Sequence, residues 1–163
     1  MDLYKKIEKL VADQYGKPLG TRKATGDFML TDSHAVNVKS NNVDKKNYSA
    51  NMISIKKMHK WVFEERHDLS FVFVDYKHKG GKLKILKQSR PIRIERLSWD
   101  CLSIEAQGYG VIQMNRDRKV VPGQTKSEFY KGFRAAYEKY LQKEKKKHKN
   151  FAKKLIDPDS INW

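Results

Sequence analysis

Apolar and polar residues alternate along this chain with two different periods. The apolar positions between Leu3 and Val11 are mostly three or four residues apart with charged residues between them, which predicts an amphipathic helix over residues 2–15. Two short apolar runs, residues 28–30 and 35–38, lie on either side of the polar tetrapeptide TDSH. This second pattern predicts a β-hairpin.

Further helices and strands are predicted downstream of the hairpin. Residues 52–63 return to helical spacing, and residues 69–76, LSFVFVDY, are typical of a buried strand. The later segments are a pair of partly exposed strands over 82–97, a helical turn over 98–102, a strand interrupted by glycines over 103–114 and a basic helix over about 127–154. This order predicts one α+β (α/β-like) domain over residues 1–163, with a central mixed β-sheet flanked by helices.

The composition narrows the class of protein. No apolar run approaches the roughly 20 residues of a membrane-spanning helix. The single cysteine, Cys101, excludes a disulfide framework and a multi-cysteine zinc site. We therefore expect a cytoplasmic protein that does not associate with membranes.

Positive charge is concentrated in two segments. The chain has 35 Lys and Arg against 19 Asp and Glu, a net charge of +16. Residues 77–96 contribute +7 and residues 126–154 contribute +8, so the rest of the chain is almost neutral. Such clusters are typical of proteins that bind nucleic acid, although a solvated lysine-rich surface has the same composition.

An acid, an amide and a lysine fall within the predicted hairpin. Asp27 is followed ten residues later by Asn37-Val38-Lys39. If the hairpin turns about Ser33, Asp27 lies opposite Lys39, and Asn37 and Lys39 point to one face because they are two residues apart. Phosphodiester hydrolysis uses such a group, since oxygen ligands hold a metal ion that activates water and a lysine orients the nucleophile. The carbonyl of Val38 is a further candidate ligand.

These residues resemble the core of the PD-(D/E)xK nuclease superfamily. The resemblance rests on Asp27, on Asn37-x-Lys39 and on the following SNNV, and it is greatest to the PvuII-like, blunt-cutting branch of type II restriction endonucleases. The segments NYSANMISIKKMHKW and LSFVFVDY continue it, and LSIEAQGYGVIQM does so more weakly. The resemblance implies that a homodimer cuts double-stranded DNA at a specific sequence, with Mg²⁺ as cofactor and Mn²⁺ as a substitute.

Asn37 departs from the family pattern, in which Asp or Glu provides a second metal ligand. An amide brings no negative charge, so the affinity for Mg²⁺ should fall. Asn37 is then a natural variant compensated by another carboxylate, an inactivating replacement of Asp, or a structural residue. The resemblance makes Glu8 of the first helix a candidate additional acid, and a solvated helix charge is the alternative. The candidate catalytic residues are Asp27, Asn37, Lys39 and Glu8, and the candidate metal ligands are Asp27, Asn37 and Val38.

A polar segment, residues 41–51, follows the candidate catalytic strand and is predicted to be an irregular loop. Asn can bond adenine in the major groove and Tyr can contact phosphate, so the segment is a candidate for reading DNA, whereas turn formation explains the same composition. A basic loop before Asp27 is a candidate phosphate clamp. The candidate DNA-binding residues are Arg22, Lys23, Ser40, Asn41, Asn42, Asn47, Tyr48, Ser49 and Asn51.

Three functions remain open from the sequence. The leading one is a Mg²⁺-dependent, sequence-specific double-strand DNA endonuclease. The alternatives are a junction-resolving or repair nuclease of the same fold, and a non-catalytic DNA-binding protein in which Asn37 marks lost chemistry. Discrete fragments from long DNA, cleavage of branched DNA alone, and binding without cleavage distinguish the three.

Overall fold

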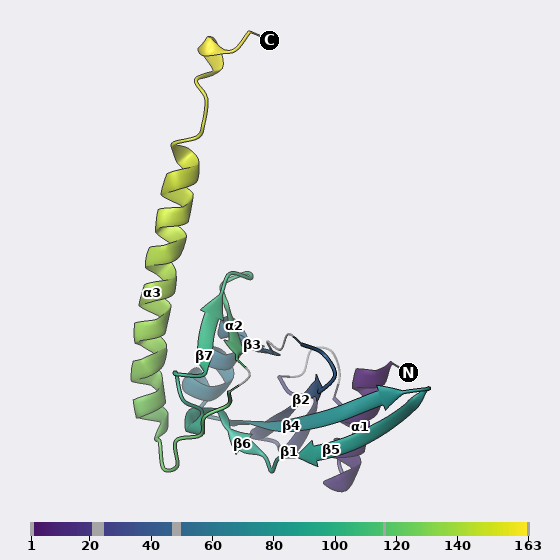
Figure 1. Ribbon diagram of the computed structural model, residues 1–163. Helices are drawn as coiled ribbons and strands as arrows, with labels where there is room; N and C mark the ends of the chain where they lie inside the picture. Colours follow the sequence, from purple (N-terminus) through teal and green to yellow (C-terminus); the bar gives the residue numbers. More distant parts are fainter. Residues whose placement is uncertain (1, 21–24, 47–49, 116, 163) are drawn as a thin grey trace.

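A mixed β-sheet built around the predicted hairpin is at the centre of the computed structural model (Figure 1). Its strands are β1 (Phe28–Thr31), β2 (His34–Asn42), β4 (Asp68–Lys79), β5 (Lys82–Gln88) and β6 (Ile92–Arg93). β2 pairs antiparallel with β1 and parallel with β4, and β4 pairs antiparallel with β5 and β6. The structure describes residues 2–20, 25–46, 50–115 and 117–162, and these form one α+β domain, which confirms the predicted fold class.

Helix α1 (Leu3–Gln14) covers one face of this sheet, as the helical spacing predicts. Ile7 and Val11 are buried in one cluster with Val36 of β2 and Val72 of β4. Side chains alternate along a strand, so the odd-numbered residues of β2 face the other side, where Ala35 belongs to a second cluster. Asn37 and Lys39 therefore share the face that points away from α1.

A second, smaller sheet covers that other face. It consists of β3 (Ala50–Ser54), β8 (Val111–Met114) and β7 (Leu102–Glu105), in that order and antiparallel. Met52 and Ile112 from this sheet share the larger hydrophobic cluster with Phe71 and Phe73 of β4. Asn37 and Lys39 thus lie on the face between the two sheets.

The predicted helix over residues 52–63 is wrong at its beginning. The segment starts as strand β3 and becomes helical at α2 (Ile55–Met58), which continues into the π-helical segment η1 (His59–Glu64). Pairing with β8 overrides the helical spacing of the apolar residues. Ser54 then begins the helix, because its Oγ accepts a hydrogen bond from the N–H of Lys57 at 3.2 Å.

The strand interrupted by glycines that is predicted over residues 103–114 is observed as two strands, β7 and β8, which form a hairpin on either side of the glycines. Gly108 and Gly110 lie at its turn with φ angles of 60° and 118°, a region that residues with a Cβ rarely adopt. The N–H of Ile55 donates to the carbonyl of Gly110 at 3.0 Å, which joins this turn to the start of α2.

Smaller differences occur around the middle of the chain. The pair of strands predicted over residues 82–97 is confirmed as β5 and β6, which is followed by the 3₁₀ helix η2 (Ile94–Arg96). The helical turn predicted over 98–102 is a single turn in which Ser98 Oγ accepts from the N–H of Asp100 at 3.1 Å. Within the described ranges, no helix has the length and apolar character needed to cross a membrane.

Helix α3 (Lys126–Ala152) packs on the body through its first turns only. Thr125 begins it in a reciprocal capping box with Glu128. Phe129 and Phe133 are buried, whereas every residue from 145 to 160 is exposed. The distal half of the helix therefore projects away from the body, and the short helix η3 (Pro158–Ser160) follows it (Figure 1).

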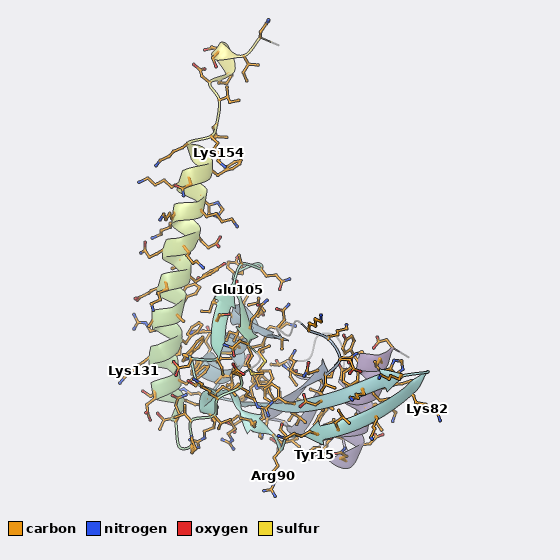
Figure 2. All side chains as sticks on the ribbon, viewed as in Figure 1. Tyr15, Lys82, Arg90, Glu105, Lys131 and Lys154 are labelled. Atoms are coloured by element: carbon orange, nitrogen blue, oxygen red, sulfur yellow. The ribbon has the colours of Figure 1, made fainter. Side chains whose placement is uncertain are left out.

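The β4–β5 hairpin forms an exposed basic projection. Gly80 and Gly81 make its two-residue turn, with φ angles of 57° and 75°. Asn42 at the end of β2 pairs with Tyr76, so the turn lies beyond the C-terminal end of β2. Its exposed lysines are Lys77, Lys79, Lys82, Lys84 and Lys87, of which Lys82 is labelled at the tip in Figure 2. Positive charge is thus concentrated at the end of the sheet where β2 finishes.

We expect Gly132→Ala to destabilise the protein by about 1–3 kcal/mol, although alanine is favoured over glycine by about 1 kcal/mol in an exposed helix. The added methyl group would overlap the indole of Trp99, whose Nε1–H donates to the carbonyl of Phe129 at 3.0 Å. Urea unfolding followed by tryptophan fluorescence measures the change. The control Ala135→Gly, at an exposed position of α3, should cost about 1 kcal/mol. A Gly132→Ala protein more stable than the native one would show that the indole of Trp99 can move aside for the methyl group.

Candidate active site

The register of the β1–β2 hairpin corrects the predicted position of Asp27. Phe28 pairs with Val36, which places Asp27 opposite Asn37 rather than opposite Lys39. The predicted pairing is wrong because Thr31 pairs with His34, so the turn is centred between Asp32 and Ser33 rather than on Ser33. A further shift in register occurs between Met29 and Thr31. A bulge of this kind cannot be read from the alternation of apolar residues.

Asp27 is held by hydrogen bonds to the backbone and side chains of β2. Its N–H lies 2.8 Å from the carbonyl of Val36 and 3.1 Å from Oδ1 of Asn37. Its Oδ2 accepts the N–H of Val38 at 2.6 Å. Strand β1 begins at the next residue, Phe28, so the carboxylate occupies the place on the edge of β2 that another strand residue would otherwise take. The acid and the amide of the motif therefore orient each other.

Gly26 permits this close approach. A Cβ atom at residue 26 would lie 2.8 Å from the carbonyl oxygen and 2.9 Å from the nitrogen of Val36, both of them backbone atoms that cannot move aside. On the other side, the carbonyl of Asp27 accepts the N–H of Gly20 at 2.7 Å. The absence of a side chain at Gly26 thus helps to position Asp27.

The structure brings Glu8 and Lys39 into the same electrostatic environment as Asp27. Burial raises the pKa of Glu8, and the negative charge of Asp27 raises it further. Burial also raises the pKa of Asp27, against the opposing effects of the Val38 N–H and the charge of Lys39. The pKa of Lys39 is lowered by burial, and the charges of Asp27 and Glu8 limit that decrease. Helix α1 therefore contributes a second acid to the motif on β2.

Two hollows adjoin these residues. One, of about 320 Å³, is lined by Asp27 and Asn37 together with Lys5, Ser54 and Lys57. Nothing in the sequence singles out these last three residues except the spacing of Lys5 and Glu8 on one helix, where the two side chains form an ion pair at 3.3 Å.

The other hollow, of about 230 Å³, is lined in part by Glu8, Val38, Lys39, Ser40 and Asn51. Glu8 Oε2 is buried and accepts no well-aligned hydrogen bond from the described residues. The candidate residues of β2 and α1 thus lie beside space that a small ligand can enter.

The described residues contain no cluster of three or more His, Cys, Asp or Glu side chains that could hold a metal ion. The oxygen donors that do converge are two carboxylates, those of Asp27 and Glu8. The carbonyl of Val38 points toward the same open edge as its N–H, because both groups of one strand residue face the same neighbour. Mg²⁺ commonly uses only one or two protein carboxylates, so this smaller set remains sufficient for it.

The predicted loop over residues 41–51 is partly wrong. Asn41 and Asn42 belong to β2, and Asn51 belongs to β3. Asn41 donates to Oδ1 of Asp75 at 3.2 Å, and Asn51 accepts a hydrogen bond from Gln113 at 2.6 Å. Asn42 Oδ1 accepts the N–H of Asp44 at 3.0 Å. Ser40 also belongs to β2. The other candidates for DNA contact, Arg22, Lys23, Asn47, Tyr48 and Ser49, lie outside the described residues.

No protein-family model matches this chain, and no curated protein matches it. Among solved structures, the chain is similar to the NlaIV restriction endonuclease, with a TM-score of 0.46 and 11% sequence identity. The similarity covers 83% of this chain and 73% of that one. The assignment to the PvuII-like branch stays a prediction.

We expect Glu8→Gln to stabilise the metal-free protein at pH 7 and to have little effect at pH 4. The folded protein holds the proton of Glu8 to a higher pH than the unfolded chain, whose carboxyl has a pKa near the ordinary value of 4.5. The native protein therefore loses stability as the pH rises above this value, and the neutral glutamine does not. Urea unfolding in EDTA at both pH values measures the difference, with the exposed Glu105→Gln as control. An equal effect at both pH values would contradict the raised pKa of Glu8.

Proposed function

We propose that this protein is a Mg²⁺-dependent endonuclease that cuts double-stranded DNA at a specific sequence, as a type II restriction enzyme does. The observation that carries the proposal is the convergence of Asp27, Glu8 and Lys39, whose pKa values are perturbed by burial and by one another's charges. Ionisable groups of opposite charge that are partly buried beside a polar hollow are typical of active sites.

The oxygen donors fit a small divalent cation. Glu8 Oε2 forms an ion pair with Lys5 Nζ at 3.3 Å but is buried without a well-aligned hydrogen bond from the described residues, and burial and the charge of Asp27 raise the pKa of Glu8. A cation bound between these carboxylates would relieve both penalties. Asp27, Glu8 and the carbonyl of Val38 would therefore hold Mg²⁺ or Mn²⁺, which when bound would activate water and neutralise charge on the phosphate.

Asn37 would position the acid more than it would hold the metal ion. Its Oδ1 already accepts the N–H of Asp27 at 3.1 Å, and its other polar atom is an amide nitrogen, which cannot ligate a cation. Among the three explanations for Asn37, this arrangement supports a natural variant in which another carboxylate, Glu8, provides the second charge.

Lys39 would provide the positive charge at the reacting phosphate. Partial burial removes water from its ammonium group and leaves the group close enough to Asp27 and Glu8 to feel both charges. In phosphodiester hydrolysis, water attacks phosphorus and the bond from phosphorus to the leaving oxygen breaks. Lys39 would orient the attacking water and stabilise the negative charge that accumulates on the phosphate oxygens.

The exposed lysines of the β4–β5 hairpin would hold the DNA backbone near this site. Except for Lys87, which is level with Asn41, they lie beyond the C-terminal end of β2, the strand that carries Lys39. Phosphate contacts of this kind supply affinity and orientation, whereas base contacts supply specificity. Asn51 and Ser40, which line the hollow beside Glu8 and Lys39, remain the described candidates for base contact. A homodimer with one site in each subunit would match a palindromic target by symmetry.

Incubation of the purified protein with long linear DNA tests the function. We expect discrete fragments with Mg²⁺, none with EDTA, and a rate at least ~100-fold lower for Lys39→Ala, because the variant loses charge stabilisation in the transition state. The control Lys60→Ala removes an exposed lysine of η1 and should cut at the native rate.

Three outcomes would contradict the proposal. Native cleavage by Lys39→Ala would place the active site elsewhere. Cleavage confined to branched DNA would favour the junction-resolving alternative. Tight binding without cleavage by the native protein and by Asn37→Asp would favour the non-catalytic alternative.

We expect Asn37→Asp to bind Mg²⁺ roughly tenfold more tightly than the native protein. One carboxylate oxygen can keep the hydrogen bond from the N–H of Asp27, and the second oxygen replaces the amide nitrogen. Metal-free stability should fall, since a third carboxylate joins Asp27 and Glu8. Thermal unfolding over a series of Mg²⁺ concentrations measures both effects, with the exposed Asn150→Asp as control.

The cleavage rate of Asn37→Asp also distinguishes the explanations of this residue. A large gain in rate would identify Asn37 as a disabling substitution. Little change, or a loss caused by the extra charge, would identify a natural site completed by Glu8. An unchanged affinity for Mg²⁺ would contradict the placement of the metal ion beside Asp27.

A further inference from the structure

The distal half of α3 carries apolar side chains that the body of the protein does not cover. Phe151 is 62% exposed, and Leu155, just beyond the helix, is 69% exposed. The chain continues past Ala152 through hydrogen bonds from Lys154 N–H to Phe151 O at 2.9 Å and from Leu155 N–H to Ala152 O at 3.2 Å. Leu155 therefore lies three residues past the C-terminal end of α3, outside the helix.

These side chains end a stripe with regular heptad spacing. Its members alternate four and three residues apart: Tyr137, Leu141, Glu144, His148, Phe151 and Leu155. The seven lysines between residues 143 and 154 all lie off this stripe. A helix that only binds polyanions has no need for such a separation, whereas two paired helices require it.

The first members of the stripe border an apolar groove. The groove has a volume of about 590 Å³ and lies between α3, α2 and the β7–β8 turn. Its lining includes Ile55, Tyr109, Phe133, Tyr137 and Leu141. Phe151 is ten residues beyond Leu141, about 15 Å farther along a rigid helix, so it cannot cover the groove of its own chain.

We propose that two copies of this chain pair antiparallel through α3, so that the tip of each helix covers the groove of the other copy. Leu141 packs against the partner's Phe151, and Tyr137 packs against the partner's Leu155. Glu144 then lies opposite the partner's His148. Two-fold symmetry repeats each contact, so the five stripe residues within each α3 and Leu155 just beyond it are all used.

The polar centre of the stripe supports this direction of pairing. Within one chain, Glu144 Oε2 and His148 Nε2 lie 3.7 Å apart on the same face of the helix. Antiparallel pairing brings each Glu144 beside a second His148, whereas parallel pairing sets Glu144 against Glu144 and leaves both grooves open. A polar layer within an apolar seam also selects one register.

The pairing would supply the homodimer that the proposed nuclease requires, but it depends only on α3 and the groove. Its test therefore needs neither DNA nor metal ion, and its failure would leave the proposal for Asp27, Glu8 and Lys39 intact. Loss of nuclease activity in Lys39→Ala would likewise say nothing about α3.

Sedimentation equilibrium of the full chain measures dimerisation and so tests the proposed pairing through α3. The native protein should be a dimer, and Phe151→Asp should raise the dissociation constant at least ~100-fold because symmetry places two charges in the seam. The control Ile156→Asp alters a residue that is 65% exposed but lies off the stripe, and it should dimerise normally. A monomeric native protein, or equal effects of the two substitutions, would overturn the proposal.

The dependence of affinity on salt concentration distinguishes this pairing from DNA binding by the same helix. Lys145 and Lys147 flank the seam, where each approaches its own copy in the partner, so dimers should become tighter as salt rises. DNA binding weakens with salt. If Phe151→Asp lowered DNA affinity and left the mass of the protein unchanged, the stripe would be a nucleic-acid surface instead.

Disulfide trapping determines the direction of pairing. Leu141→Cys and Phe151→Cys should each stay uncrosslinked alone and form a heterodimeric disulfide when mixed under oxidising conditions. The native Cys101 is buried, so the native protein should give no crosslink. Crosslinking of either variant with itself and not in the mixture would indicate parallel helices and would overturn the proposal.

Discussion

The carboxylate of Asp27 takes the place of a strand residue on the edge of β2, and the geometry of the candidate site depends on this interaction. Its Oδ2 accepts the N–H of Val38, while its own N–H points to Asn37. The carboxylate is therefore held in position even though it is partly buried and close to a second acid. Lys39 follows Val38 directly, so the strand that holds the carboxylate of Asp27 also carries the lysine. Gly26 is the residue that lets the two strands approach closely enough.

This arrangement places two partly buried carboxylates, those of Asp27 and Glu8, near one another at one point of the fold. Ile7 and Val11 fix α1 on the sheet through apolar burial, and the same helix carries Glu8 toward Asp27. Neither carboxylate gains enough from its neighbours to offset burial, since both pKa values are raised. A bound cation would remove the conflict, and a DNA phosphate would meet the ammonium of Lys39. Binding of a cation and of a DNA phosphate would thus compensate the charges of this site.

The spacing of residues along α3 places its lysines and its heptad stripe on different faces of the helix. Its lysines lie around most of the helix, whereas the heptad stripe from Tyr137 to Leu155 is free of them. The first part of that stripe borders the groove on the body, and the last part is exposed. One helix can therefore offer a seam to a second copy of the chain and basic charge to DNA.

The sequence by itself determined the class of fold and the members of the motif. Local spacing was enough for α1, the β1–β2 hairpin and α3, because apolar periodicity reflects which face of an element is buried. It was not enough for β3, where pairing with β8 replaced a helix, or for the register that placed Asp27 opposite Asn37. Strand pairing and bulges depend on partners distant in sequence, which periodicity does not encode. Only the tertiary structure decided that Glu8 joins Asp27 and Lys39, because docking of α1 sets the burial that perturbs all three pKa values.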